Sequence, residues 1–186
     1  MKVFYNYLPN EFSDNEKILN DWQKLIKSSD FTLGKYVLDF ENKFKKFLNV
    51  KHCISTNNGT DALTLSLKSL GIGPGDQVIT VTNTFYATVG AIVAVGATPV
   101  LIDCDERFQI NVKAIEEVIN TNTKAIIPVH WGGASPDMEA IMDISVKHNI
   151  HVVEDACMGI GALVDQKAPG TFGKVNAFSM HPLKSL

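Results

Sequence analysis

Short runs of valine and isoleucine alternate with helix-like segments over most of the chain, and this alternation constrains the fold more than any other feature. The runs are apolar on both faces, which is typical of parallel strands covered by helices on both sides. A parallel strand needs a crossover connection, so the pattern predicts an α/β fold in three layers, with a mostly parallel sheet between helices. The expected strands are residues 53–55, 77–81, 99–102, 125–129, 151–154 and 177–179, with helices beginning near Thr60, Phe85, Val112 and Asp137.

The N-terminal part of the chain has a different pattern, with helices alone. Ser13 and Glu16 form a capping-box pattern ahead of apolar residues at helical spacing. Residues 31–34 break this helix, and a second amphipathic helix follows them. We therefore expect a helical segment at residues 1–35 and a larger α/β domain at residues 36–186.

Composition excludes several classes of protein. The 186 residues carry a net charge of −3 and are 45% hydrophobic, so neither a strongly basic nucleic-acid binder nor a disordered chain is expected. The chain has neither an apolar run long enough to span a membrane nor a secretory h-region. Cys53, Cys104 and Cys157 have no metal-type spacing, and an odd number of cysteines does not form a complete disulfide framework. These features predict a cytoplasmic protein with reduced thiols and no bound metal.

Four local features carry chemistry. The turn at residues 57–63 opens a helix after a predicted strand, where free N–H groups can bind an anion, although a simple cap has the same pattern. Asp155 ends a strand and faces the expected ligand crevice, or else caps a helix. Phe85 can be a core aromatic residue, and Lys184 can be an ordinary solvated charge.

A single ligand explains all four features. Pyridoxal phosphate needs an anion site for its phosphate and an acid for its pyridine nitrogen. It also needs a surface for its ring and a lysine for a Schiff base. The sequence resembles the DegT-type nucleotide-sugar aminotransferases, which use pyridoxal phosphate and have fold type I. The resemblance covers essentially the whole chain. It rests on the runs at residues 58–63, 71–76, 84–88, 129–130, 154–156 and 178–184.

The resemblance implies a role for each site residue. Lys184 would form the Schiff base, and Asp155 would pair with the pyridinium nitrogen. Ser179 and the Gly59-Thr60-Asp61 turn would hold the phosphate, and Phe85 would stack on the ring. His130 and His181 also match family positions, and for both we expect a structural or orienting role. Family members often carry Gln or His near the cofactor's phenolic oxygen. Here Met158 stands at that cofactor-binding position and cannot donate a hydrogen bond.

The implied activity is transfer of an amino group from an amino acid, with glutamate the expected donor, to a nucleotide-linked keto sugar. Such a reaction belongs to amino-sugar or surface-polysaccharide biosynthesis. The resemblance also implies a homodimer with a shared active site. Related sugar dehydratases have His in place of the lysine, so Lys184 favours transamination. Three alternatives stay open: a sugar dehydratase or lyase, a non-catalytic regulatory module that binds pyridoxal phosphate, and an α/β domain that binds another phosphate compound.

The position of Lys184 also bears on the length of the chain, which ends two residues later. Members of the family are roughly twice as long. We therefore expect that these residues lack the end of the large domain and the small C-terminal domain. On this interpretation the 186 residues alone fold poorly and turn over nothing. Two roles stay open for Phe4, Tyr5, Tyr7 and residues 31–34. They line the substrate entrance, or they pack in the core or at an interface.

Overall fold

A computed structural model describes residue 3 and residues 6–184 of the chain. It divides into two compact units, one ending at Ser55 and the other beginning at Thr56, later in the chain than the boundary expected at residue 35. Among the described residues, none of the helices is long and apolar enough to cross a membrane. Phe4 and Tyr5, which were considered for the substrate entrance, lie outside the described residues.

The first unit is helical, with α1 (Leu8–Glu11), α2 (Glu16–Ser28) and α3 (Lys35–Leu48). The break between α2 and α3 confirms the prediction for residues 31–34. The predicted capping box is wrong, because Asn15 takes the N-cap position of α2, without a side-chain cap bond, and the Ser13 hydroxyl donates to the Asn10 carbonyl at 2.7 Å instead. The predicted strand at residues 53–55 is also wrong, since the Ser55 N–H donates to the Glu41 side chain at 2.7 Å and pairs with no strand.

The second unit contains a five-stranded parallel sheet, which confirms the predicted α/β class. Its strands lie in the order β2-β1-β3-β4-β5. β3 ends two residues earlier than expected, because Pro128 follows it and lacks the N–H that would continue the ladder. The strands are β1 (Gln77–Val81), β2 (Thr98–Ile102), β3 (Thr123–Ile127), β4 (His151–Asp155) and β5 (Val175–Ala177).

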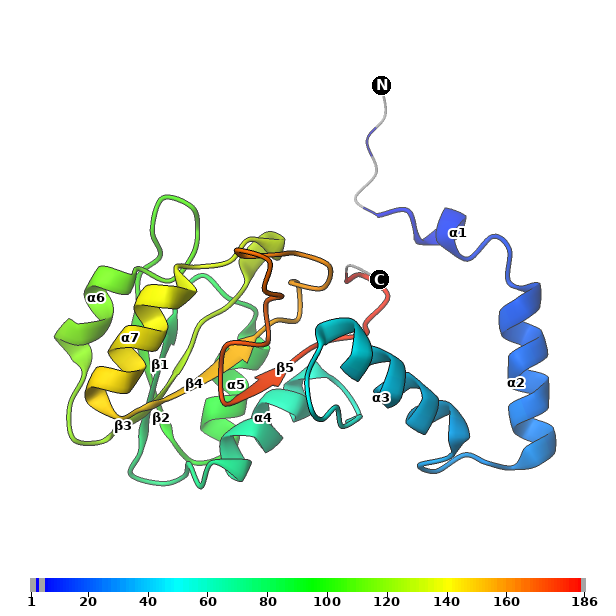
Figure 1. The fold of residues 1–186 in the computed structure, drawn as a ribbon, viewed down its shortest axis with the longest axis horizontal. Helices are drawn as coiled ribbons and strands as arrows, with labels where there is room; N and C mark the ends of the chain where they lie inside the picture. The colour runs from blue at the N-terminus through cyan, green and yellow to red at the C-terminus, as the bar shows by residue number, and fades with distance from the viewer. Residues whose placement is uncertain (1–2, 4–5, 185–186) are drawn as a thin grey trace. The chain divides into compact units, whose positions relative to one another are not determined.

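Helices cover both faces of the sheet, as Figure 1 shows. Successive residues of a strand point to opposite faces, and the two apolar cores follow this alternation: Val78 belongs to one core and Ile79 to the other. α4 (Gly59–Ser69) and α5 (Tyr86–Ala94) pack in the first core, and α6 (Val112–Val118) and α7 (Met138–His148) pack in the second. The three-layer arrangement predicted from the doubly apolar strands is therefore confirmed.

Candidate active site

The candidate site lies at the carboxyl edge of the sheet in the second unit. Here β4 and β5 end, and α4 and α5 begin. Asp155 pairs with Ala177 in the last register position of these two strands, so Phe178 and Ser179 leave the sheet beside it. Ligands of open α/β sheets bind at this edge, because the loops that follow the strands diverge there.

Asp155 is a nearly buried acid held by donors on two sides. Its side chain is at the end of β4, and the residue is only 6% exposed. Oδ2 accepts the Thr88 hydroxyl at 2.7 Å, and Oδ1 accepts the backbone N–H of Cys157 at 3.2 Å. A carboxylate has about four lone-pair positions, so these contacts leave capacity for another donor.

Lys184 is brought back toward the sheet by a tight turn after β5. The Lys184 N–H donates to the His181 carbonyl at 2.8 Å, and the Leu183 N–H donates to His181 Nδ1 at 3.1 Å. The His181 N–H in turn donates to Ser179 Oγ at 3.3 Å. His181 thus organises the turn that carries Lys184.

The beginning of α4 lies against the segments that follow β4 and β5. A Cβ added to Gly59 would lie 3.1 Å from Cys157 Sγ and 3.2 Å from the Ser179 Cβ, so glycine permits this close approach. Asn58 caps the helix, and its Oδ1 accepts the Asp61 N–H at 2.9 Å. Because the cap engages the Asp61 amide, the amides of Gly59 and Thr60 are left at the helix start, where an anion is favoured.

Cys157 lies among these groups as a protonated thiol. Burial raises its pKa, and the negative charge and hydrogen bond of Asp155 raise it further, whereas Lys184 acts in the opposite direction. Because the thiolate is the nucleophilic form of cysteine, this thiol is unreactive at neutral pH. The Cys157 N–H donates to Asp155 Oδ1 and its Sγ lies against Gly59, so this residue joins the acid to the beginning of α4.

The structure connects most of the site residues expected from the sequence. Gly59 lies against Ser179, and the cap joins Thr60 and Asp61 to the same helix start. Phe85 precedes α5 and is 51% exposed, with Lys184 above its ring. Met158 is half-buried in the turn after β4, and its carbonyl oxygen would lie 3.3 Å from a Cβ added to Gly133.

Sequence reasoning missed Thr88, which contacts Asp155 across 67 positions of the chain. A signal was available, because Thr88 lies one helical turn after Phe85 in a predicted helix start. Its partner Asp155 could not be identified from the sequence, because the two residues are far apart along the chain.

His130 and Glu154 form a second buried polar pair, whose hydrogen-bond partners differ from those of Asp155. Both side chains are fully buried, and His130 Nε2 lies 2.9 Å from Glu154 Oε2. Glu154 also accepts backbone N–H groups of Gly170, Phe172 and Gly173 at 2.6–2.7 Å. These bonds fix the loop that leads into β5 and give Glu154 a structural role.

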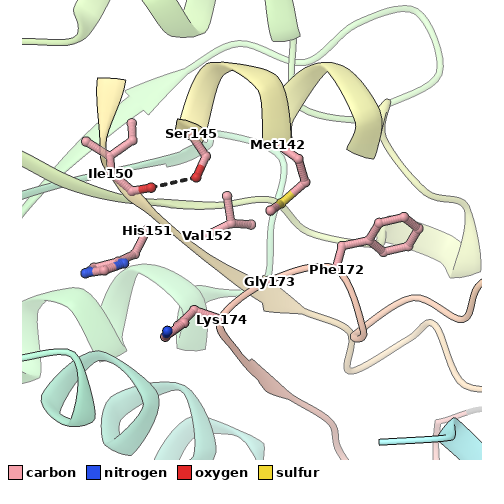
Figure 2. A pocket seen from close by; sticks show the side chains of 8 residues that line it. All are labelled: Met142, Ser145, Ile150, His151, Val152, Phe172, Gly173 and Lys174. Atoms are coloured by element: carbon pink, nitrogen blue, oxygen red, sulfur yellow. Dashed lines mark hydrogen bonds between the residues drawn. The ribbon is translucent and has the colours of Figure 1, made fainter. Parts of the chain in front are cut away.

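A separate hollow of about 340 Å³ lies beside α7, at the opposite end of β4 from Asp155. Figure 2 shows Met142 and Phe172 on one side of the strand, with His151 and Lys174 pointing the other way. The polar side chains that line the hollow therefore do not converge on one ligand position, and the hollow is not the candidate site.

Comparison with known proteins decides the family. The sequence profile described as the DegT/DnrJ/EryC1/StrS aminotransferase family matches residues 13–186. The chain belongs to this family. The resemblance found in the sequence is thus confirmed.

Relatives of known name are similar over most of this chain. A protein named UDP-N-acetyl-3-dehydro-alpha-D-glucosamine 3-aminotransferase, from Acidithiobacillus ferrooxidans, is 42% identical over 92% of this chain and 47% of its own length. A GDP-perosamine synthase from Caulobacter vibrioides is 42% identical over 80% of this chain and 40% of its own length. The chain therefore spans about half the length of the curated relatives it matches.

Solved structures extend the similarity to the fold. A DegT/DnrJ/EryC1/StrS aminotransferase from Brucella abortus matches with a TM-score of 0.90 and 34% identity, over 98% of this chain and 52% of that one. NtdA from Bacillus subtilis, solved with bound cofactor PMP, matches with a TM-score of 0.86 and 38% identity, over 91% of this chain and 38% of that one. The parallel sheet between helical layers is thus that of fold type I aminotransferases, as predicted.

Proposed function

We propose that the protein containing this chain is a pyridoxal phosphate-dependent aminotransferase that acts on a nucleotide-linked keto sugar. The observation that carries the proposal is the convergence of Lys184, Phe85 and Asp155 at one edge of the sheet. Membership of the aminotransferase family supports the same conclusion.

The residues present fit pyridoxal phosphate. Asp155 is a buried carboxylate whose partners leave lone pairs for a ring N–H. The Gly59 approach to Ser179 gathers a hydroxyl and a helix start into one anion-binding position. Phe85 offers an exposed ring face next to the Lys184 amine.

Each site residue has a definite task in this proposal. The cofactor supplies an electron sink for the transfer of the amino group. Asp155 holds a proton at the pyridine nitrogen, since an opposite charge favours the charged ring. Lys184 would hold the cofactor covalently through Nζ, and its amine, once displaced by the amino donor, would carry a proton from the donor's carbon to C4′ of the cofactor. Ser179 and the amides of Gly59 and Thr60 would bind the phosphate, with Asp61 tied to the same turn by the Asn58 cap. Phe85 would orient the ring, and Met158 has no group that could donate a hydrogen bond to the phenolic oxygen.

The finer parts of the proposal rest on the relatives. Their names include UDP-linked, GDP-linked and dTDP-linked sugars, so a nucleotide sugar is proposed as the acceptor, with glutamate as the donor. A relative from Bacillus subtilis is named a spore coat polysaccharide biosynthesis protein, in keeping with a role in polysaccharide biosynthesis. We further propose a cytoplasmic homodimer with a shared active site, in which residues 36–186 belong to the cofactor-binding large domain and residues 1–35 form a helical segment.

A regulatory role is the second candidate, because one relative has a name of that kind. The protein called Pleiotropic regulatory protein, from Geobacillus stearothermophilus, is 41% identical over 91% of this chain. A sensor would bind the cofactor without turnover, so the two candidates differ in their products.

The test incubates the complete protein with pyridoxal phosphate, glutamate and a panel of nucleotide keto sugars, followed by mass spectrometry. An amino sugar together with 2-oxoglutarate supports transamination. A deoxy sugar or free ammonia would indicate a dehydratase or lyase, and cofactor binding without turnover would indicate the regulatory module. Borohydride reduction and peptide mapping provide the residue-level control, since the cofactor should be attached to Lys184 and to no other lysine.

A further inference from the structure

We propose that Thr88 is a positioning residue that holds the Asp155 carboxylate in place for the cofactor's pyridine nitrogen. This inference rests on the proposed use of pyridoxal phosphate and adds a residue to its site. Thr88 is fully buried, and its hydroxyl donates to Asp155 Oδ2 at 2.7 Å. A short hydrogen bond to a charged acceptor is among the stronger ones in proteins.

A second threonine gives this hydrogen bond its direction. Thr84 Oγ1 lies 2.7 Å from Thr88 Oγ1. A hydroxyl has one proton to donate, and an ionised carboxylate can only accept. With Thr88 donating to Asp155, Thr84 must donate to Thr88. The chain of hydroxyls is therefore ordered toward the carboxylate.

The two oxygens of Asp155 are held by different elements. Thr88 of α5 holds Oδ2, whereas the N–H of Cys157, in the turn after β4, holds Oδ1. Together these contacts fix the plane of the carboxylate and still leave it able to accept another N–H.

Thr88 also joins the acid to the ring surface. Its backbone N–H donates to the Phe85 carbonyl at 3.1 Å and closes the first turn of α5. Through its backbone Thr88 places Phe85, and through its hydroxyl it places Asp155. Both groups that would face the cofactor ring are thus positioned by one residue.

The test compares Thr88→Val with Thr88→Ser in the complete protein. Valine keeps the shape and removes the hydroxyl, whereas serine keeps the donor. We expect Thr88→Val to weaken pyridoxal phosphate binding by about tenfold, the effect of losing one charge-assisted hydrogen bond, and Thr88→Ser to stay within about threefold of wild type. The pH titration of the bound cofactor's absorbance should shift with Thr88→Val, because it reports the charge around the ring.

Thr80→Val is the matched control. Thr80 is also fully buried, and its hydroxyl donates to the Ile127 carbonyl at 2.8 Å, within the sheet. Thr80→Val should change the stability of the protein but leave the cofactor's affinity and titration as in wild type. Thr84→Val serves if Thr88→Val does not fold, and it should shift the titration in the same direction by a smaller amount.

The outcomes separate this inference from the proposed function. If wild type binds the cofactor and both valine variants at positions 84 and 88 match it in affinity and titration, the positioning role is overturned. An equal shift in Thr80→Val would likewise reduce the role of Thr88 to ordinary stability. If wild type fails to bind pyridoxal phosphate at all, the proposed function fails and this inference fails with it.

Discussion

The amine of Lys184 lies over the ring of Phe85, with 5.7 Å between Nζ and the ring centroid. The two residues come from different parts of the sheet, since Phe85 follows β1 and Lys184 follows β5. Their meeting places an aromatic face and an amine at the carboxyl edge, where the relatives' fold would hold a ligand.

Replacing Phe85 by alanine should weaken cofactor binding with little effect on stability. The ring is 51% exposed, so its removal leaves no cavity in the core. Loss of stacking should raise the dissociation constant of pyridoxal phosphate about tenfold, and Phe85→Tyr should retain most of the affinity. Absorbance titration of the complete protein measures both.

Phe108→Ala is the control for this prediction, because Phe108 is similarly exposed at 62% and lies in the loop after β2. Equal affinity losses in the Phe85 and Phe108 variants would argue against a stacking role for Phe85.

Alanine at Gly59 should disturb the phosphate position. The added Cβ would lie 3.1 Å from Cys157 Sγ and 3.2 Å from Ser179 Cβ, so α4 or its neighbours must shift. We expect several-fold weaker binding of pyridoxal phosphate and a loss of about 1 kcal/mol in the free energy of unfolding. Equilibrium dialysis and urea unfolding measure the two effects.

The control is Gly90→Ala within α5. Nothing lies within 4 Å of a Cβ added there. Alanine at this helical position should stabilise the protein by about 0.5–1 kcal/mol and leave cofactor binding unchanged. If Gly59→Ala behaves in the same way, the close approach to Ser179 has no role in binding.

Local patterns were enough to predict a parallel sheet between helices, although they added a strand at residues 53–55 that does not form. They also predicted which residues would lie together at the carboxyl edge of the sheet. The doubly apolar strands required helices on both faces, and residues after parallel strands had to share an edge. Cap assignment was less secure, because Ser13 and Asn15 are both good capping residues and the position at which the helix begins decides between them. The Thr88–Asp155 bond was out of reach, since it depends on how α5 packs beside β4.

Glu154→Gln should destabilise the fold. The carboxylate accepts from His130 and from three backbone N–H groups, and all of these contacts are in or next to the buried core. A glutamine turns one acceptor oxygen into a donor that faces other donors. We expect the free energy of unfolding to fall by roughly 3 kcal/mol, since a buried group loses its match.

Urea unfolding checks this loss, with Glu117→Gln on the exposed face of α6 as the control. The control should stay within about 0.5 kcal/mol of wild type, as surface substitutions usually do. A similar small change in Glu154→Gln would show that the loop before β5 does not depend on this carboxylate.

Acid should remove the contribution of the surface ion pairs that join α6 and α7. Glu116 Oε1 lies 2.6 Å from Lys147 Nζ and 2.7 Å from His148 Nε2, and the hydrogen bonds from Lys147 and then His148 lower the pKa of this carboxyl. A carboxyl whose pKa is lowered by folding stabilises the protein above its unfolded pKa, and that contribution is lost as pH falls through the folded value. The stability difference between wild type and Glu116→Gln should therefore be present at neutral pH and vanish in acid. Because the pairs are exposed, about 1 M salt should also reduce it. A difference that stays constant across this pH range would mean that the Glu116 charge does not contribute.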